Sequence, residues 1–150
     1  MLARRSPFES GAADLETPLI VRIEDAAAVE RARRLSRQLA TAIGFNPHDV
    51  ECIAIAVSEL ATNLLRYAEH GEIVSRVIHD DGGIGIEVES RDRGPGIADL
   101  PQAMCEGFST AGGLGHGLSG AKRMMDDFQI ESGPSGTHIR ACKWLNPRSS

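Results

Sequence analysis

Two clusters of glycine lie between Arg91 and Phe128 and restrict what the chain around them can fold into. The first is DRGPG at 92–96, and the second is GGLGHG at 112–117, which runs straight into a helix-like segment. Glycine reaches positive φ and lets a ligand approach main-chain N–H groups closely. Because a helix N-terminus also favours anions, the second cluster predicts a nucleotide- or phosphate-binding turn.

Capping residues and helical spacing predict two long helices before these clusters. Asp25 suits the N-cap of the first helix, and Gly44 suits the position just after its end. Asn46 suits the N-cap of the second helix, with Pro47 at the first helical position. Apolar residues spaced 3, 4, 3 and 4 give the second helix a buried stripe, which consists of Val50, Ile53, Val57, Leu60 and Leu64.

Alternating and β-branched segments with turn residues between them predict strands and hairpins. The expected strands are 18–24, 72–80, 83–90, 128–132 and 137–144, and the expected helices are 26–43, 47–68, 118–127 and a short one at 99–106. This order predicts an α/β fold, a two-layer α/β sandwich with a mixed, mainly antiparallel sheet and helices on one face. One domain is expected over 18–145, with a mobile tail at 1–17 and a short tail at 146–150.

Composition narrows the class of protein. The net charge of −5 argues against a nucleic-acid binder. Three widely spaced cysteines (Cys52, Cys105 and Cys142) give no disulfide framework and no paired metal motif, which favours reduced thiols and a cytoplasmic location. No apolar run is long enough for a membrane span. The first residues of the sequence do not have the pattern of an export signal.

Three groups of residues carry the chemistry. Glu59 and Asn63 are one helical turn apart in the most apolar helix, an unusual place for a carboxylate. Asp92 begins the first glycine cluster, and the second cluster precedes a helix. The second cluster lacks the Lys-Ser/Thr ending of a Walker A loop, and its spacing is not that of a dinucleotide-binding turn.

Together and in this order, the three groups resemble the GHKL family of ATPases, whose fold is the Bergerat α/β sandwich, over residues 25–144. The segments SELATNLLRYA and GLGHGLSGAKRMMDDF are most similar to RsbT-type switch kinases of bacterial partner-switching (stressosome) modules. The next most similar group is the anti-sigma-factor kinases of the RsbW and SpoIIAB type. The resemblance implies ATP as substrate and Mg²⁺ as cofactor.

The resemblance also implies roles for individual residues. Asn63 would be the Mg²⁺ ligand, Glu59 would orient or deprotonate the attacking hydroxyl, and Asp92 would read the adenine. Residues 98–114 would form a flexible lid over the nucleotide. The further residues implied at the nucleotide site are Arg66, Gly94, Gly96, Ile97, Ser109, Thr110, Gly113, Leu114, Gly115, His116, Gly117, Leu118 and Thr137.

Plainer interpretations stand beside these. Glu59 taken alone would be a surface acid, Asp92 a turn-former and Arg66 a solvated side chain. His116 invites a phosphohistidine interpretation, but a loop position over phosphates explains it better. The arginines of the first helix form either a solvated face or a docking surface for an acidic partner. The remaining histidines form no metal-ligand spacing, and they are His48, His70, His79 and His138.

The implied function is an ATP-dependent serine/threonine protein kinase that phosphorylates a STAS-domain antagonist or scaffold protein and switches partners. One alternative is an anti-sigma factor that sequesters a sigma factor. Another is a binding module that activates a PP2C-type phosphatase. The catalytic domain of a two-component histidine kinase is disfavoured, because the first helix contains no histidine between Asp25 and Ile43. Neither nucleic acid nor a membrane is expected as a partner.

Overall fold

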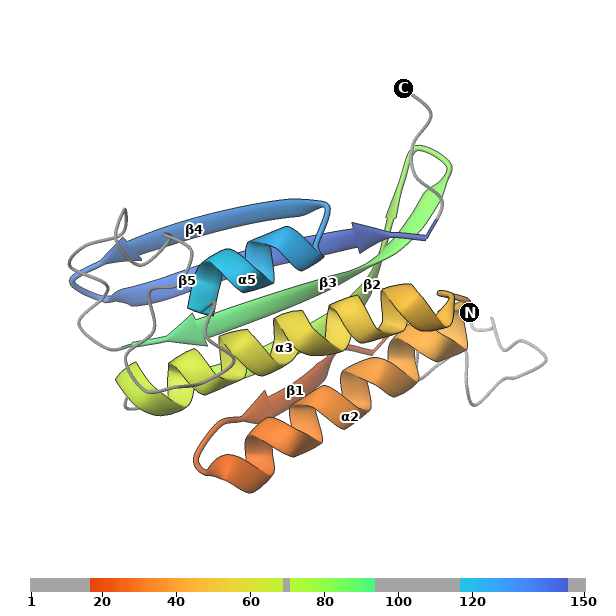
Figure 1. The fold of residues 1–150 in the computed structure, drawn as a ribbon. Helices are drawn as coiled ribbons and strands as arrows, with labels where there is room; N and C mark the ends of the chain where they lie inside the picture. The colour runs from red at the N-terminus through yellow and green to blue at the C-terminus, as the bar shows by residue number, and fades with distance from the viewer. Residues whose placement is uncertain (1–16, 69–70, 94–116, 146–150) are drawn as a thin grey trace.

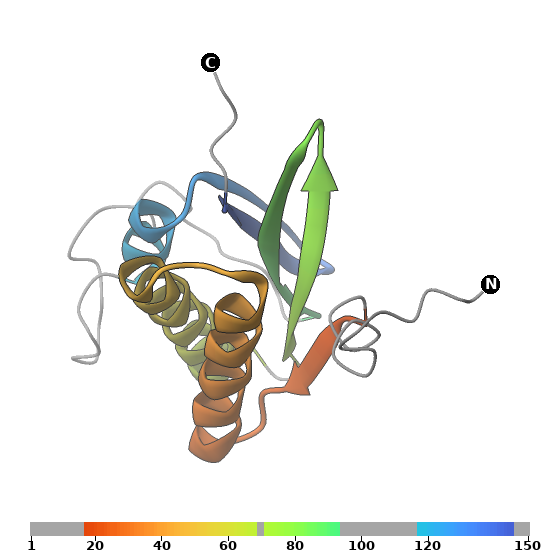
Figure 2. The same ribbon diagram turned by 90° about the vertical axis from the view of Figure 1, so that its right-hand side faces the viewer.

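The computed structural model describes residues 17–68, 71–93 and 117–145, which form two layers. Three helices in these residues cover one face of a five-stranded sheet (Figures 1 and 2). In chain order the elements are β1 (Leu19–Arg22), α2 (Ala26–Ile43), α3 (Pro47–Tyr67), β2 (Gly71–Asp80), β3 (Gly83–Asp92), α5 (Gly117–Met124), β4 (Asp127–Gly133) and β5 (Gly136–Trp144). The predicted α/β sandwich is confirmed.

The sheet has the strand order β1-β2-β3-β5-β4, and every neighbouring pair in it is antiparallel. The two predicted hairpins, β2–β3 and β4–β5, are present, with Asp80 opposite Gly83 and Gly133 opposite Gly136. Because β5 lies between β3 and β4, the end of β3 is brought next to the turn that begins β5. The predicted helix at 99–106, the lid at 98–114 and nearly all of the two tails lie outside the described residues.

Both ends of α2 and the start of α3 lie where their capping residues predict. The Asp25 side chain accepts a hydrogen bond from the N–H of Ala28 at 2.9 Å. Gly44 closes α2 with φ of +109°, a conformation that favours glycine. The Asn46 side chain accepts from the N–H of Asp49 at 2.8 Å and starts α3. Among the described helices, none is both long and apolar enough to cross a membrane.

Helix α3 forms the centre of the core. All five members of its predicted apolar stripe are buried, and Ile53, Val57 and Leu60 are fully covered. Each such side chain contributes about 1.5–3 kcal/mol by leaving water. Helix α2 is joined to the sheet by a buried polar contact as well, a 2.9 Å hydrogen bond between the hydroxyls of Ser36 and Ser75. The helix that carries the candidate chemistry is therefore held rigidly.

The predicted helix end at Asp127 is wrong, because α5 stops at Met124. The N–H of Asp126 donates to the carbonyl of Cys142 at 2.8 Å, and its carboxylate accepts from the N–H of Trp144 at 2.8 Å. These contacts with β5 replace the next helical turn. The apolar spacing continues to Met125, which is buried, so the sequence alone gives no sign of the change.

The sheet face opposite the helices carries a network of charges. Successive strand residues point to opposite faces, so the core positions Ile86 and Val88 place Glu87 and Glu89 on the open face. Both carboxylates are nonetheless buried. Their partners within 3.5 Å are Arg76, Arg91, His138 and Arg140. These side chains stack over the glutamates and shield them from water.

Burial is the largest single effect on the Glu89 carboxyl, and it acts to raise the pKa of this group. The hydrogen bond from Arg91 and the charges of Arg76 and Arg91 outweigh it, with a smaller contribution from His138. The pKa of Glu89 is therefore lower than its ordinary value. The carboxylate stays ionised, and its contribution to stability is lost only as the pH falls through this lowered value.

Cys142 on the same face is expected to react slowly with alkylating reagents. Burial, and then the charges of Glu87 and Asp127, raise the pKa of its thiol from 9.0 to about 11. Since only the thiolate reacts, a pKa raised by two units reduces the rate near neutral pH by about 100-fold relative to the denatured chain. Peptide-level mass spectrometry after timed exposure to iodoacetamide measures this rate. Equal rates in the folded and denatured chain would contradict the shift.

The same shift predicts a pH dependence of stability. Because the folded pKa of Cys142 lies above the ordinary value of 9.0, the native state holds the thiol proton more tightly than the unfolded state does. The thiol's contribution to stability is complete below pH 9 and is lost as the pH rises toward 11. Cys142→Ser should remove this part of the alkaline loss.

Candidate functional site

Helix α3 places three candidate residues along one of its faces. Glu59, Asn63 and Arg66 follow one another at intervals of four and three residues, so they project in nearly the same direction. Glu59 is only 7% exposed, Asn63 is half-buried and Arg66, in the last turn, is exposed. The face thus runs from a buried carboxylate to an exposed cation. The burial of Glu59 excludes its interpretation as a surface acid.

Asp92 lies at the end of β3 and is joined to the start of β5. One of its carboxylate oxygens accepts a hydrogen bond from the N–H of Thr137 at 3.3 Å. The hydroxyl of Thr137 lies 2.8 Å from that of Ser132 across the β4–β5 hairpin, and Thr137 is buried. The structure therefore brings together two residues that are 45 positions apart and were both predicted at the nucleotide site.

Gly136 makes this contact possible, and it was not predicted as a site residue. It has φ of +136°, which L side chains rarely adopt. A Cβ atom built on it would lie 2.0 Å from the carbonyl oxygen of Asp92 and 3.0 Å from the Cα of Arg93. Only glycine allows β3 and β5 to come this close. The signal in the sequence was a glycine at the end of a turn directly before Thr137.

Helix α5 spans Gly117–Met124, so the structure includes the last glycine of the second cluster in the helix that was predicted from Leu118. The side chain of Leu118 is 2% exposed and Ala121 is fully buried, so both pack into the core. Leu118 can therefore meet a ligand only through its main chain. This suits a helix N-terminus, where the first N–H groups have no partners within the helix and attract anions.

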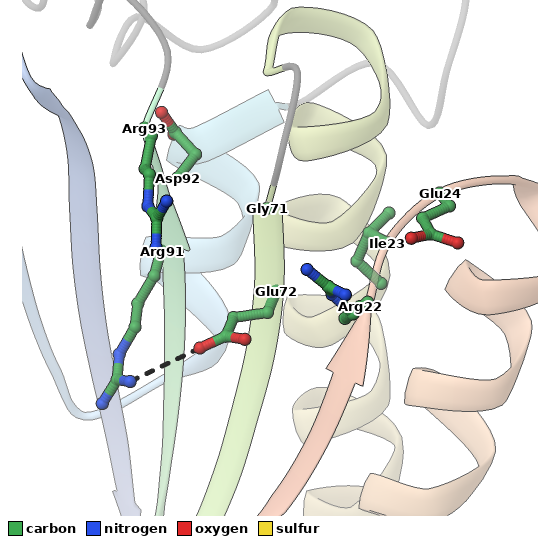
Figure 3. A pocket seen from close by; sticks show the side chains of 8 residues that line it. All are labelled: Arg22, Ile23, Glu24, Gly71, Glu72, Arg91, Asp92 and Arg93. Carbon is green, nitrogen blue, oxygen red and sulfur yellow. Dashed lines mark hydrogen bonds and ion pairs between the residues drawn. The ribbon is translucent and has the colours of Figure 1, made fainter.

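Two pockets meet at the end of β3. The first has a volume of about 510 Å³ and is shown in Figure 3. It is lined by Arg22, Ile23, Glu24, Gly71, Glu72, Arg91, Asp92 and Arg93. In it, Arg91 reaches toward Glu72 on the adjacent strand, at 3.5 Å. Its three arginines are balanced by three carboxylates, which does not favour a strongly charged ligand.

The second pocket, of about 610 Å³, adjoins Asp92, Ser132, Gly136 and Thr137. Its lining combines hydroxyls and main-chain groups with two carboxylates, Asp92 and Glu131, and two basic side chains, Arg91 and His138. Such polar groups can bind the polar edge of a base. Neither Glu59 nor Asn63 lines either of these two pockets. The second pocket contains the Asp92–Thr137 contact, and both of these residues were predicted at the nucleotide site.

Nine of the predicted site residues lie outside the described residues. They are Gly94, Gly96, Ile97, Ser109, Thr110, Gly113, Leu114, Gly115 and His116. Their assignment stays a prediction. Of the predicted site, the described residues contain Asp92 at the end of β3, the face of α3 with Glu59 and Asn63, and the start of α5 at Gly117.

The donors on α3 have the right chemistry for Mg²⁺. This ion prefers oxygen ligands, and it takes one or two from protein while waters and phosphates supply the rest. The half-buried amide of Asn63 offers one such oxygen beside the buried carboxylate of Glu59. The ion would add positive charge at the phosphates of ATP.

The class of protein follows from this fold and site. The family described as histidine kinase-like ATPase domain matches residues 24–143, which is most of the chain. The chain therefore belongs to this family, and the resemblance to GHKL ATPases is confirmed.

Among individual proteins, the chain is similar to serine/threonine-protein kinase RsbT of Bacillus subtilis. The two are 44% identical over 126 residues, which cover 83% of this chain and 95% of that protein. It is also 41% identical over 98 residues to anti-sigma F factor of Heyndrickxia coagulans, a match that covers 59% of this chain and 65% of that protein.

Solved structures confirm the fold. The RsbU and RsbW domains of a Mycobacterium tuberculosis protein match with a TM-score of 0.61 and 18% identity, over 87% of this chain and 33% of that one. The mycobacterial sensor histidine kinase MprB matches with a TM-score of 0.50 and 18% identity, over 89% of this chain and 99% of that one. At this identity the similarity is one of fold alone.

Proposed function

We propose that this chain is an ATP-dependent serine/threonine protein kinase of a bacterial partner-switching module, and that its substrate is a STAS-domain protein. The observation that carries the proposal is the buried carboxylate of Glu59, one turn from Asn63, in a chain 44% identical to a serine/threonine kinase over nearly its whole length. A carboxylate is rarely buried unless protein groups pair with it or a ligand or reaction uses it, and the kinase proposal gives Glu59 such a use. The similarity to RsbT supports the hydroxyl as the acceptor.

In such a transfer, each of the described site residues has a separate role. Asp92 accepts a hydrogen bond from the exocyclic amine of adenine, and its contact with Thr137 fixes its orientation. The N-terminus of α5 attracts the phosphates. Glu59 accepts the proton of the attacking hydroxyl, and its rigid helix holds it in place. Asn63 would hold Mg²⁺, which would supply positive charge to neutralise the phosphates.

A second function is sequestration of a sigma factor, as an anti-sigma factor would perform. The similarity to anti-sigma F factor supports it, but over a smaller part of both proteins than the similarity to RsbT. A third is activation of a PP2C-type phosphatase by contact. Both are binding functions that do not require Glu59, whereas the kinase function does.

The experiment that tests the kinase proposal is transfer from radiolabelled ATP to a STAS-domain protein in the presence of Mg²⁺. Label should appear on a serine or threonine of the STAS protein. A pull-down with an Asn63→Ala variant separates the functions, because binding should persist while transfer stops. Absence of transfer by the wild-type chain together with capture of a sigma factor or a phosphatase would replace the proposal with one of the binding functions.

Asp92→Asn is expected to weaken ATP binding by about 10–100-fold, because a hydrogen bond to a charged group contributes about 1.5–3 kcal/mol. Calorimetric titration with ATP and Mg²⁺ measures the loss. Asp81→Asn, in the exposed β2–β3 turn, is the matched control and should bind as the wild type does. Equal affinities of the two variants would remove Asp92 from the nucleotide site.

A further inference from the structure

Three side chains with metal-binding atoms meet at the first turns of α3, away from the candidate nucleotide site. They belong to His48, Asp49 and Cys52, and one ligand atom from each lies within 4.8 Å of the others. His48 and Cys52 are four residues apart, so they lie above one another on one helix face. The Nε2 atom of His48 is 3.7 Å from the Sγ atom of Cys52. The histidines show no metal-ligand spacing among themselves, and the pairing of His48 with Cys52 was not predicted from the sequence.

The 3.7 Å separation of the histidine nitrogen and the cysteine sulfur is close to that in a transition-metal site. A tetrahedral zinc ion with Zn–N and Zn–S bonds of ordinary length places nitrogen and sulfur about 3.5 Å apart. Imidazole and thiolate are ligands that Zn²⁺ prefers, whereas Mg²⁺ takes oxygen. We propose that His48, Asp49 and Cys52 bind a divalent transition-metal ion, with Zn²⁺ as the best fit and the fourth position open to water.

The surroundings allow such an ion to enter. His48 is exposed, and Asp49 and Cys52 are half-buried, so solvent reaches the cluster. Thiolate and carboxylate together neutralise a divalent ion. Two effects oppose binding, since the helix N-terminus carries partial positive charge and the Nζ atom of Lys143 lies 4.0 Å from Asp49. Lys143 also donates to the carbonyl of Met124 at 3.0 Å, which holds its charge partly away from the cluster.

The cluster is separate from the proposed catalytic face. Cys52 and Glu59 are about 10 Å apart along the axis of α3. The proposal therefore does not rest on the kinase function, and each can fail without the other. An ion here would join the first two turns of α3 and stabilise the helix that carries Glu59 and Asn63.

Cobalt(II) chloride added to the metal-free full-length chain tests the site, because sulfur ligation of Co²⁺ gives a charge-transfer absorption that oxygen ligands do not. The wild type should show a saturable band that zinc sulfate abolishes by displacement. Cys52→Ser should lose the band, and His48→Gln and Asp49→Asn should weaken cobalt binding by about 10-fold or more. Cys105→Ser and Cys142→Ser are the matched controls and should keep it.

Thermal unfolding gives a second readout. Zinc should raise the melting temperature of the wild type but not of Cys52→Ser, since a ligand that binds only the native state stabilises it. The replaced side chains are at least partly exposed, and circular dichroism checks that each variant is folded. A wild type without a sulfur-dependent band, or a band that survives Cys52→Ser, would overturn the proposal.

Discussion

Replacing Glu59 with glutamine is expected to slow phosphoryl transfer to a protein hydroxyl by about 10²–10⁴-fold and to leave ATP binding nearly unchanged. Glutamine has almost the same size and can fill the buried position of Glu59, but it cannot accept a proton. Single-turnover transfer from radiolabelled ATP to a STAS-domain protein measures the rate, and calorimetry measures the affinity. The effect would thus fall on the chemical step.

Glu51→Gln is the matched control, because Glu51 lies on the same helix but is exposed. It pairs with Arg37 at 2.6 Å, a surface contact that contributes about 0.2–1 kcal/mol. This variant should transfer phosphate at the wild-type rate. If Glu59→Gln and Glu51→Gln transfer equally fast, Glu59 does not handle the proton. If Glu59→Gln loses ATP binding as well, its carboxylate positions the nucleotide instead.

Gly136→Ala is expected to lower the free energy of unfolding by about 2–5 kcal/mol and to weaken ATP binding. An alanine with positive φ costs about 1–2 kcal/mol, and overpacking adds about 1–3 kcal/mol. The new methyl group would meet the carbonyl oxygen of Asp92 at 2.0 Å, and backbone cannot rotate aside as a side chain can. Either β3 or β5 must shift, which moves Asp92 away from Thr137. Urea unfolding and ATP titration measure the two effects.

Gly133→Ala provides the control from the same hairpin. A Cβ atom at Gly133 would meet nothing within 4 Å, and Gly133 is not among the glycines with positive φ. Its stability should change by less than about 1 kcal/mol. Equal unfolding midpoints for Gly136→Ala and Gly133→Ala would contradict the close approach of β5 to Asp92. Normal ATP binding by a destabilised Gly136→Ala would separate that approach from nucleotide binding.

Local chemistry explains why much of the fold could be predicted. Asp25, Gly44 and Asn46 act on main-chain groups within four residues of themselves, so the ends of α2 and the start of α3 are readable from the chain. The apolar stripe of α3 is likewise a local pattern, and all of it is buried. Errors occur where a distant strand competes. Helix α5 ends early because Asp126 bonds to β5, and β3 extends to Asp92 because Gly71 pairs with it.

The candidate site divides in the same way. Helical spacing is sufficient to predict that Glu59 and Asn63 share a helix face, because four residues make about one turn whatever surrounds them. The burial of Glu59, the hydrogen bond from Thr137 to Asp92 and the need for glycine at position 136 instead depend on contacts between distant segments. These facts depend on the strand order, which places β5 beside β3. Strand order results from packing between distant segments, and no periodicity within one segment encodes it.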